Sequence, residues 1–154
     1  MSATAPSLRL VRHVLARLGE TGQPPERGVE LVDVGNGRRL AVLEREYLRP
    51  IAEDGRGSTF KLVQASYGGG KTHFLLCLRE RAWALGFATA IVGLSPDACP
   101  FDNPAKVWQA VARELSLPPT DPESLPPRGI ESVLSSLLQV RRDRDGDLAA
   151  RAWI

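Results

Sequence analysis

The stretch with the clearest chemical potential is Ala65–Thr72, which reads ASYGGGKT. A loop that holds phosphate needs backbone N–H groups converging on oxygen atoms, and glycine permits the unusual dihedral angles and the close approach. In the standard pattern G-x-x-x-x-G-K-[ST], the lysine reaches the β- and γ-phosphates and the hydroxyl binds Mg²⁺. The stretch therefore predicts a binding site for ATP and Mg²⁺, with Lys71 as its catalytic cation and Thr72 as the ligand of Mg²⁺.

The motif departs from the standard pattern at Ala65, where the first glycine should stand. Alanine costs little in an extended conformation, so the loop can keep its shape with an altered entry. A match to [AG]-x-x-x-x-G-K-[ST] arises by chance in about one chain in a hundred of this length. The alternative is a glycine-rich turn in which Thr72 only starts a helix, but this alternative leaves Lys71 unexplained. The predicted cofactor-binding residues are Ala65, Ser66, Tyr67, Gly68, Gly69, Gly70, Lys71, Thr72 and His73.

Two of these residues carry alternatives of their own. His73 lies in the first turn of the helix that should follow the loop, a position more typical of a packing or solvent-exposed histidine than of a catalyst. Tyr67 could pack on the nucleotide or on protein. The sequence leaves both assignments open.

The elements expected around the loop are a strand before it and a helix after it. Residues 59–63 form a β-branched and apolar run of strand length. Residues 73–85 carry apolar side chains at helical spacing, and Gly86 is placed to stop that helix. The almost wholly apolar run 87–94 fits a parallel strand buried on both faces. The sequence therefore predicts an α/β fold of the P-loop NTPase class, a parallel sheet with flanking helices.

The remaining segments alternate between helical periodicity and turn residues. Residues 7–18 repeat apolar side chains at helical spacing, although their basic, acid-poor composition also resembles a targeting peptide. A short strand is expected at residues 29–34, and a surface helix at 38–52 that Pro50 ends or bends. Further helices are expected at 105–115 and 129–140.

The end of the chain suggests a larger protein. Residues 141–147 are rich in charge and predict a solvated turn, after which residues 148–154 begin a new periodic segment and stop. We therefore expect a fragment truncated after the first strands of its sheet. It would consist of a helical lead-in, residues 1–56, and the N-terminal part of a P-loop core, residues 57–154.

Hydrolysis of ATP needs an acidic residue after a later strand, a group that orients water and often an arginine finger. Asp33 follows an apolar run but precedes the loop, so it is interpreted as a turn residue. Asp97 and Asp102 could line the site, but their Pro and Asn neighbours favour ordinary loop capping. No residue of the sequence is identified for these catalytic roles.

Composition limits the class of protein. The 154 residues are 43% apolar and 25% charged with a net charge of +2, as in an ordinary soluble globular protein. No run of like charges marks a nucleic-acid arm, so DNA binding is neither indicated nor excluded. No apolar stretch approaches the roughly 18 residues of a membrane span, and the N-terminus lacks the apolar core of a secretory signal. The sequence therefore predicts a cytoplasmic protein that does not associate with a membrane. Cys77 and Cys99 lack metal or redox spacing between them and are expected to be buried, reduced thiols.

Over residues 22–117 the chain resembles the ATP-binding P-loop proteins of bacteriophage-exclusion (BREX) defence systems. The resemblance rests on PPERGVELVDVG, RRLAVLEREYLRPIAEDGRG and FKLVQASYGGGKTHFLLCLRERAWALGFATAIVGLS, and its most specific part is YGGGKTHFL at residues 67–75. That family typically has Y-G-S-G-K-T, from which this chain departs at Gly69, in addition to Ala65. The layout is also similar to that of the wider group of origin-recognition and signalling ATPases.

The resemblance implies an AAA-like ATPase, longer than this chain, that acts with protein partners in a bacterial defence complex against phage DNA. Only residues 66–72 have matched roles, as contacts to phosphate and Mg²⁺. This chain alone is expected to hydrolyse ATP slowly or not at all. The alternatives are a non-catalytic nucleotide switch or interaction module and, because the loop does not specify the acceptor, a kinase or other phosphotransferase.

Overall fold

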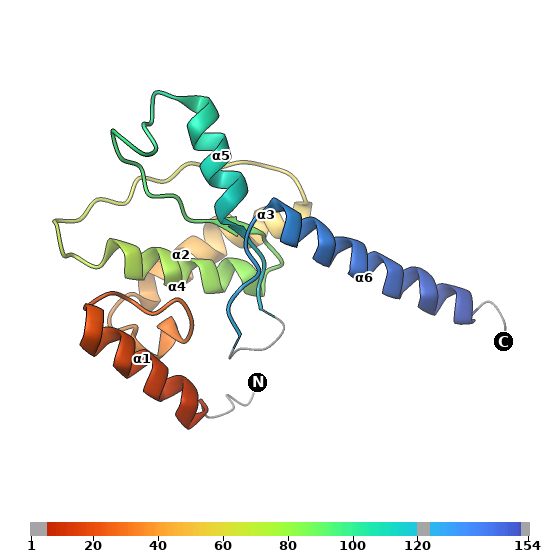
Figure 1. The fold of residues 1–154 in the computed structure, drawn as a ribbon, viewed down its shortest axis with the longest axis horizontal. Coiled ribbons are helices and arrows are strands. Elements are labelled where there is room, and N and C mark those ends of the chain that lie inside the picture. Colours follow the sequence, from red (N-terminus) through yellow and green to blue (C-terminus); the bar gives the residue numbers. More distant parts are fainter. Residues whose placement is uncertain (1–5, 120–123, 152–154) are drawn as a thin grey trace. The chain divides into compact units, whose positions relative to one another are not determined.

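The structure is a computed structural model that describes residues 6–119 and 124–151 (Figure 1). The chain divides into two compact units. The first comprises Met1–Phe87 and Pro118–Leu125, and the second comprises Ala88–Leu117 and Pro126–Ile154. The described residues are mainly helical and include one two-stranded antiparallel sheet. None of the helices in the described ranges combines the length and the apolar character that a membrane crossing requires.

The first unit contains α-, 3-10 and π-helical segments and no strand among its described residues. The predicted N-terminal helix is confirmed. The Ser7 hydroxyl caps its first turn by accepting a hydrogen bond from the Leu10 N–H. Gly22, in the left-handed conformation, caps its end. The elements are α1 (Leu8–Thr21), η1 (Val29–Val32), α2 (Gly37–Leu43), η2 (Glu44–Leu48), α3 (Arg49–Asp54) and α4 (Lys71–Ala84).

The strand predicted at residues 29–34 is wrong. Val29–Val32 instead form the short 3-10 helix η1, in which the N–H of Leu31 donates to the carbonyl of Gly28. Val29 is completely buried. Val29 alone of this run is buried, whereas Leu31 and Val34 are exposed. The run has no neighbouring strand to pair with among the described residues, and a 3-10 turn satisfies its backbone locally.

The predicted surface helix is longer than expected and passes through Pro50. The helical run from α2 to α3 contains a π-helical stretch at η2, and Pro50 lies in the first turn of α3, directly after that stretch. Glu44 accepts hydrogen bonds from Arg49 (2.5 Å) and from Arg81 of α4 (2.7 Å). These bonds, that of Arg81 above all, lower the pKa of the Glu44 carboxyl and link the helical run to α4.

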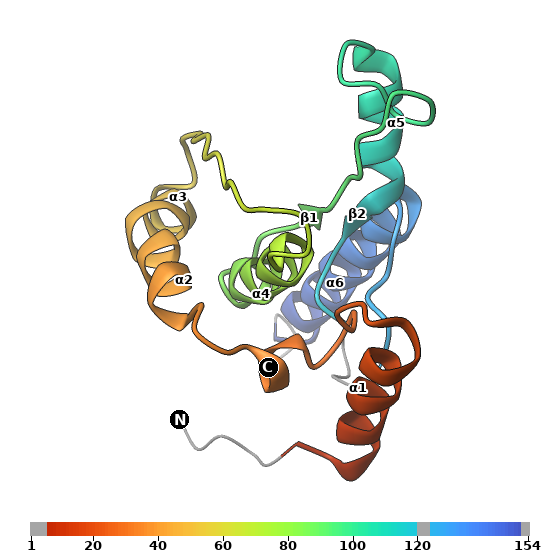
Figure 2. The same ribbon diagram turned by 90° about the vertical axis from the view of Figure 1, so that its left-hand side faces the viewer.

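The strand predicted before the glycine loop is also wrong. Residues 56–66 have no ladder partner, and Figure 2 shows this segment passing from α3 to α4 as irregular chain. All residues from 52 to 72 are exposed, including Phe60 at 84%. A β-strand exists only through hydrogen bonds to a neighbour, and the described residues offer this segment none.

The second unit contains the sheet, α5 (Pro104–Glu114) and α6 (Ile130–Arg151). Strand β1 (Thr89–Ala90) pairs antiparallel with β2 (Leu115–Ser116), opposing Thr89 to Ser116. The parallel sheet predicted from the run 87–94 is therefore absent from the described residues. The strand that pairs with β1 is β2, and it runs antiparallel. Within that run only two residues pair.

The two helices of the second unit test two further expectations. The helix predicted at 105–115 is confirmed as α5, whose N-terminus is capped by the Asn103 side chain accepting from the Lys106 N–H. Helix α6 begins as predicted but continues to Arg151, so the solvated turn at 141–147 is wrong. Charged residues tolerate a solvated helix as well as a turn. Residues 152–154, the end of the last periodic segment, lie outside the described residues.

Candidate phosphate-binding loop

The glycine loop leads directly into α4, as the sequence predicts. Helix α4 begins at Lys71, and the preceding Gly70 is its N-cap, with a φ of 76°. Gly68 has the same φ, so both positions adopt the left-handed conformation that side-chain-bearing residues rarely accept. The N–H of Phe74 donates to the carbonyl of Gly70 (2.9 Å), and the buried Phe74 ring anchors the first turn. The two glycines thus turn the chain so that the positive end of the helix faces the loop.

The Lys71 ammonium folds back over the loop. Its Nζ donates to the carbonyls of Ala65 (2.9 Å) and Ser66 (2.7 Å). An ammonium has three donors, and two of them bind carbonyls of the loop itself. The loop is tightened further by a bond from the N–H of Gly69 to the Ser66 carbonyl (3.1 Å). Residues that are close together in sequence therefore form a compact, hydrogen-bonded loop, with the Lys71 ammonium bound to two of its carbonyls.

Gly69 is fixed by close packing rather than by its dihedral angles. A Cβ at this position would lie 3.0 Å from the Ser66 carbonyl oxygen and 3.2 Å from the Ala65 Cβ. Ala65 itself therefore crowds a side chain at position 69, which would fit only if its neighbours shifted by a few tenths of an ångström. The alanine that departs from the standard pattern and the extra glycine are physically coupled in this loop.

The hydroxyl of Thr72 is exposed, and within the described residues it has no hydrogen-bond partner. A hydroxyl at the start of a helix beside a glycine loop is suited to bind a hard cation that accompanies phosphate. Tyr67 is also fully exposed, so its ring packs on none of the described protein groups.

Two pockets meet at Lys71 within the first unit. The larger has a volume of about 1190 Å³ and extends from the loop to the start of α2, where it is bordered by Arg38 and Arg39. The smaller, about 640 Å³, lies along Tyr67–His73 and is closed by Gln23 and Pro24. The larger pocket is thus bordered by three cationic side chains near the loop. Arg38 and Arg39 were not among the predicted site residues, because nothing in the spacing of two residues so distant from the loop indicates that they lie beside it.

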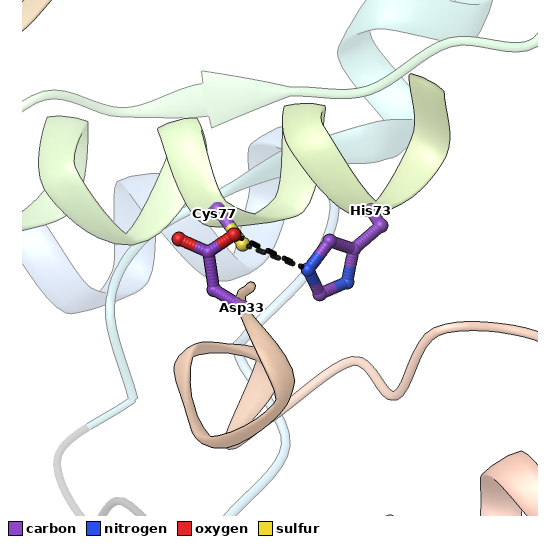
Figure 3. A group of neighbouring side chains, drawn as sticks. All are labelled: Asp33, His73 and Cys77. Atoms are coloured by element: carbon purple, nitrogen blue, oxygen red, sulfur yellow. Dashed lines mark hydrogen bonds and ion pairs between the residues drawn. The ribbon is translucent and has the colours of Figure 1, made fainter. Parts of the chain in front are cut away.

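The His73 imidazole lies beside Asp33 and Cys77 (Figure 3). Its Nε2 lies 3.7 Å from Asp33 Oδ1 and 3.6 Å from Cys77 Sγ. Burial, followed by the carboxylates of Asp33, Glu30 and Glu80, raises the pKa of the Cys77 thiol to about 11. A thiol with that pKa stays protonated at neutral pH and is a poor nucleophile. As predicted, Cys77 and Cys99 are both free and buried.

The three acidic candidates occupy different places. Asp33 ends η1 and accepts a hydrogen bond from the Asn36 side chain (2.8 Å), which agrees with a turn residue, but it also faces His73. Asp97 and Asp102 lie in turns of the second unit that precede α5. The proximity of Asp33 to α4 was not predicted, since 40 residues separate it from His73.

We predict that Gly70→Ala lowers the free energy of unfolding by about 1 kcal/mol, because a left-handed conformation costs a side-chain-bearing residue roughly 1–2 kcal/mol. Urea unfolding followed by circular dichroism measures the change. Gly19→Ala is the matched control: Gly19 lies inside α1 with nothing near its would-be Cβ, so this variant should be more stable by about 0.5–1 kcal/mol. Equal stability of Gly70→Ala and the unmodified chain would show that the left-handed turn is not required.

A glycine loop with a lysine above it at the N-terminus of a helix is an arrangement that binds phosphate groups. In comparison with protein families, residues 7–141 match the BREX system ATP-binding protein BrxC/D. The chain therefore belongs to this family of BREX ATP-binding proteins. No curated protein matches the chain in the corresponding comparison, and no solved structure does.

Proposed function

We propose that this chain binds Mg-ATP through residues 65–73 and is the nucleotide-binding part of an ATPase in a BREX defence system. The observation that carries the proposal is the position of Lys71, whose ammonium lies over the loop at the N-terminus of α4. Membership of an ATP-binding family supports it independently. The P-loop class is proposed from loop and helix, without support from a sheet.

The β- and γ-phosphates would replace the carbonyls of Ala65 and Ser66 as acceptors of the Lys71 ammonium. The N–H groups at the start of α4 and of the glycine loop would bind the same oxygens. Thr72 would hold Mg²⁺, which neutralises phosphate charge when bound. The rest of the nucleotide would occupy the larger pocket, where Arg38 and Arg39 favour an anionic ligand.

Hydrolysis would depend on groups beyond this loop. Within the described residues of the first unit, the carboxylate that faces α4 near the loop is Asp33, and it is engaged with Asn36. We therefore expect binding with slow turnover or none in this chain, and faster turnover in a longer protein acting with protein partners, with DNA as the wider target of the defence system. In that setting residues 57–154 would be the N-terminal part of the nucleotide-binding core.

Equilibrium dialysis of the chain against radiolabelled ATP, with Mg²⁺ or with EDTA, tests the proposal. We expect one bound nucleotide per chain, with affinity reduced when EDTA removes Mg²⁺. Phosphate release measured in the same samples separates the alternatives: tight binding without release supports the nucleotide switch, and release of ADP only with an added acceptor supports a phosphotransferase. Absence of binding by a cooperatively folded chain would reject the proposal.

A further inference from the structure

Asp33, His73 and Cys77 bring three different metal-ligating groups together beside the first turns of α4 (Figure 3). One ligand atom from each, a carboxylate oxygen, an imidazole nitrogen and a thiol sulfur, lies within 4.8 Å of the other two. His73 and Cys77 are four residues apart and therefore project from the same face of α4. Asp33 reaches them from the end of η1.

The two distances from the His73 imidazole agree with those between ligands of one tetrahedral ion, and the third, between Asp33 and Cys77, is within 4.8 Å. Zinc bonds of about 2.0–2.3 Å at tetrahedral angles place neighbouring ligand atoms roughly 3.4–3.6 Å apart. The measured separations from His73 Nε2 are 3.6 Å to Cys77 Sγ and 3.7 Å to Asp33 Oδ1. Only a small inward movement of the side chains would complete the coordination.

The chemistry of the three ligands selects a class of ion. Thiolate and imidazole ligands favour borderline metals such as Zn²⁺, whereas Mg²⁺ and Ca²⁺ prefer sets made of oxygen. We propose that Asp33, His73 and Cys77 form a binding site for Zn²⁺, with the fourth position taken by water. The site is separate from the proposed Mg²⁺ position at Thr72 and goes beyond nucleotide binding.

The surroundings of the cluster permit access and orientation. The side chains of His73 and Asp33 are 19% and 15% exposed, and His73 borders both pockets beside the loop, so an ion can enter from solvent. The Asn36 side chain donates to Asp33 Oδ1 (2.8 Å) and fixes that carboxylate, as outer-shell groups do in metal sites. On binding, the Cys77 thiol releases its proton to solvent and the thiolate sulfur bonds to the ion.

The ion would join two segments that the sequence keeps far apart. His73 follows Thr72 directly, so an ion held between Asp33 and His73 clamps the end of η1 to the first turn of α4. The ion would therefore hold these two segments together beside the glycine loop. It should raise the melting temperature of the chain in the absence of nucleotide.

Titration of the tag-free, reduced chain with Co²⁺ in the absence of nucleotide tests the site, because Co²⁺ replaces Zn²⁺ and reports its ligands by absorption. We expect one equivalent to bind with a thiolate-to-cobalt charge-transfer band and the visible bands of a four-coordinate ion, and Zn²⁺ to displace it. Excess Mg²⁺ should leave the bands unchanged. Absence of the charge-transfer band would overturn the proposal.

Variants of the three ligands identify the site. Asp33→Asn and His73→Asn should each weaken Co²⁺ binding at least about tenfold, and Cys77→Ser should abolish the charge-transfer band. The chain has one further histidine and one further cysteine, so His13→Asn and Cys99→Ser are matched controls that should bind like the unmodified chain. If the buried Cys77→Ser fails to fold by circular dichroism, the two more exposed variants decide. Unchanged affinity in folded Asp33→Asn and His73→Asn would reject the site.

Discussion

Replacing Lys71 with alanine should abolish the rise in melting temperature that Mg-ATP produces in the unmodified chain. Ligand at about 100 times its dissociation constant adds roughly 2.7 kcal/mol to the free energy of unfolding. For a chain of this length that corresponds to a shift of roughly 5–10 °C. The variant loses the ammonium that lies over the loop, so its shift should fall below about 1 °C. Differential scanning fluorimetry with and without Mg-ATP measures both shifts.

Lys61→Ala is the matched control for this experiment. Lys61 is also in the first unit, but its ammonium lies over the Tyr47 ring, 3.8 Å from the centroid, and not over the loop. The control should lose at most about 1 kcal/mol of stability, as expected for an exposed cation–π contact, and keep the full shift with Mg-ATP. An undiminished shift in Lys71→Ala would contradict the proposed function, and an equal loss in both variants would point to non-specific electrostatic binding.

The second large effect is expected at Arg79, a charged residue buried in α4. Its side chain is 5% exposed, and its guanidinium donates to the Glu26 carbonyl and to Glu80 (2.9 Å) and lies 4.2 Å from the centroid of the Trp83 ring. Arg79→Ala removes these partners together and leaves Glu80 without its cation. We expect the free energy of unfolding to fall by about 3 kcal/mol, as when one partner of a buried pair is deleted.

Urea unfolding of Arg79→Ala and Arg81→Ala compares two arginines on one helix. Arg81 is 36% exposed and bonds to Glu44, so its loss should cost about 1 kcal/mol or less. If Arg79→Ala is no less stable than Arg81→Ala, the conclusion that Arg79 anchors α4 is wrong. The midpoint should shift with an unchanged slope, since the same surface is exposed on unfolding.

The loss of unfolding free energy in Arg79→Ala, relative to the unmodified chain, should also depend on pH. Burial raises the pKa of the Glu80 carboxyl, and Arg79 opposes this rise. A raised pKa means that the fold favours protonated Glu80, so its contribution to stability is lost as pH increases through the folded pKa. Without Arg79 this loss grows, and the deficit should be larger at about pH 7 than at about pH 4. A deficit independent of pH would assign it to lost packing alone.

The sequence by itself determined the helices with strong local signals and the position of the glycine loop directly before α4. Helices α1, α4 and α5 lie where periodicity placed them, and the caps at Ser7 and Asn103 use bonds between residues three apart. The hydrogen bonding of Lys71 is equally local, because its acceptors lie five and six residues earlier. Such features depend on neighbours in the chain, which a sequence displays directly.

Only the tertiary structure decided the pairing of strands and the surroundings of α4. Apolar runs at 29–34 and 59–63 have strand composition, but a strand requires a partner from elsewhere, and neither finds one among the described residues. Asp33 meets His73 and Cys77, and Arg38 and Arg39 border the pocket at Lys71, across 32 to 44 residues of chain. Contacts at that separation depend on how helices pack, and no spacing in the sequence encodes their geometry.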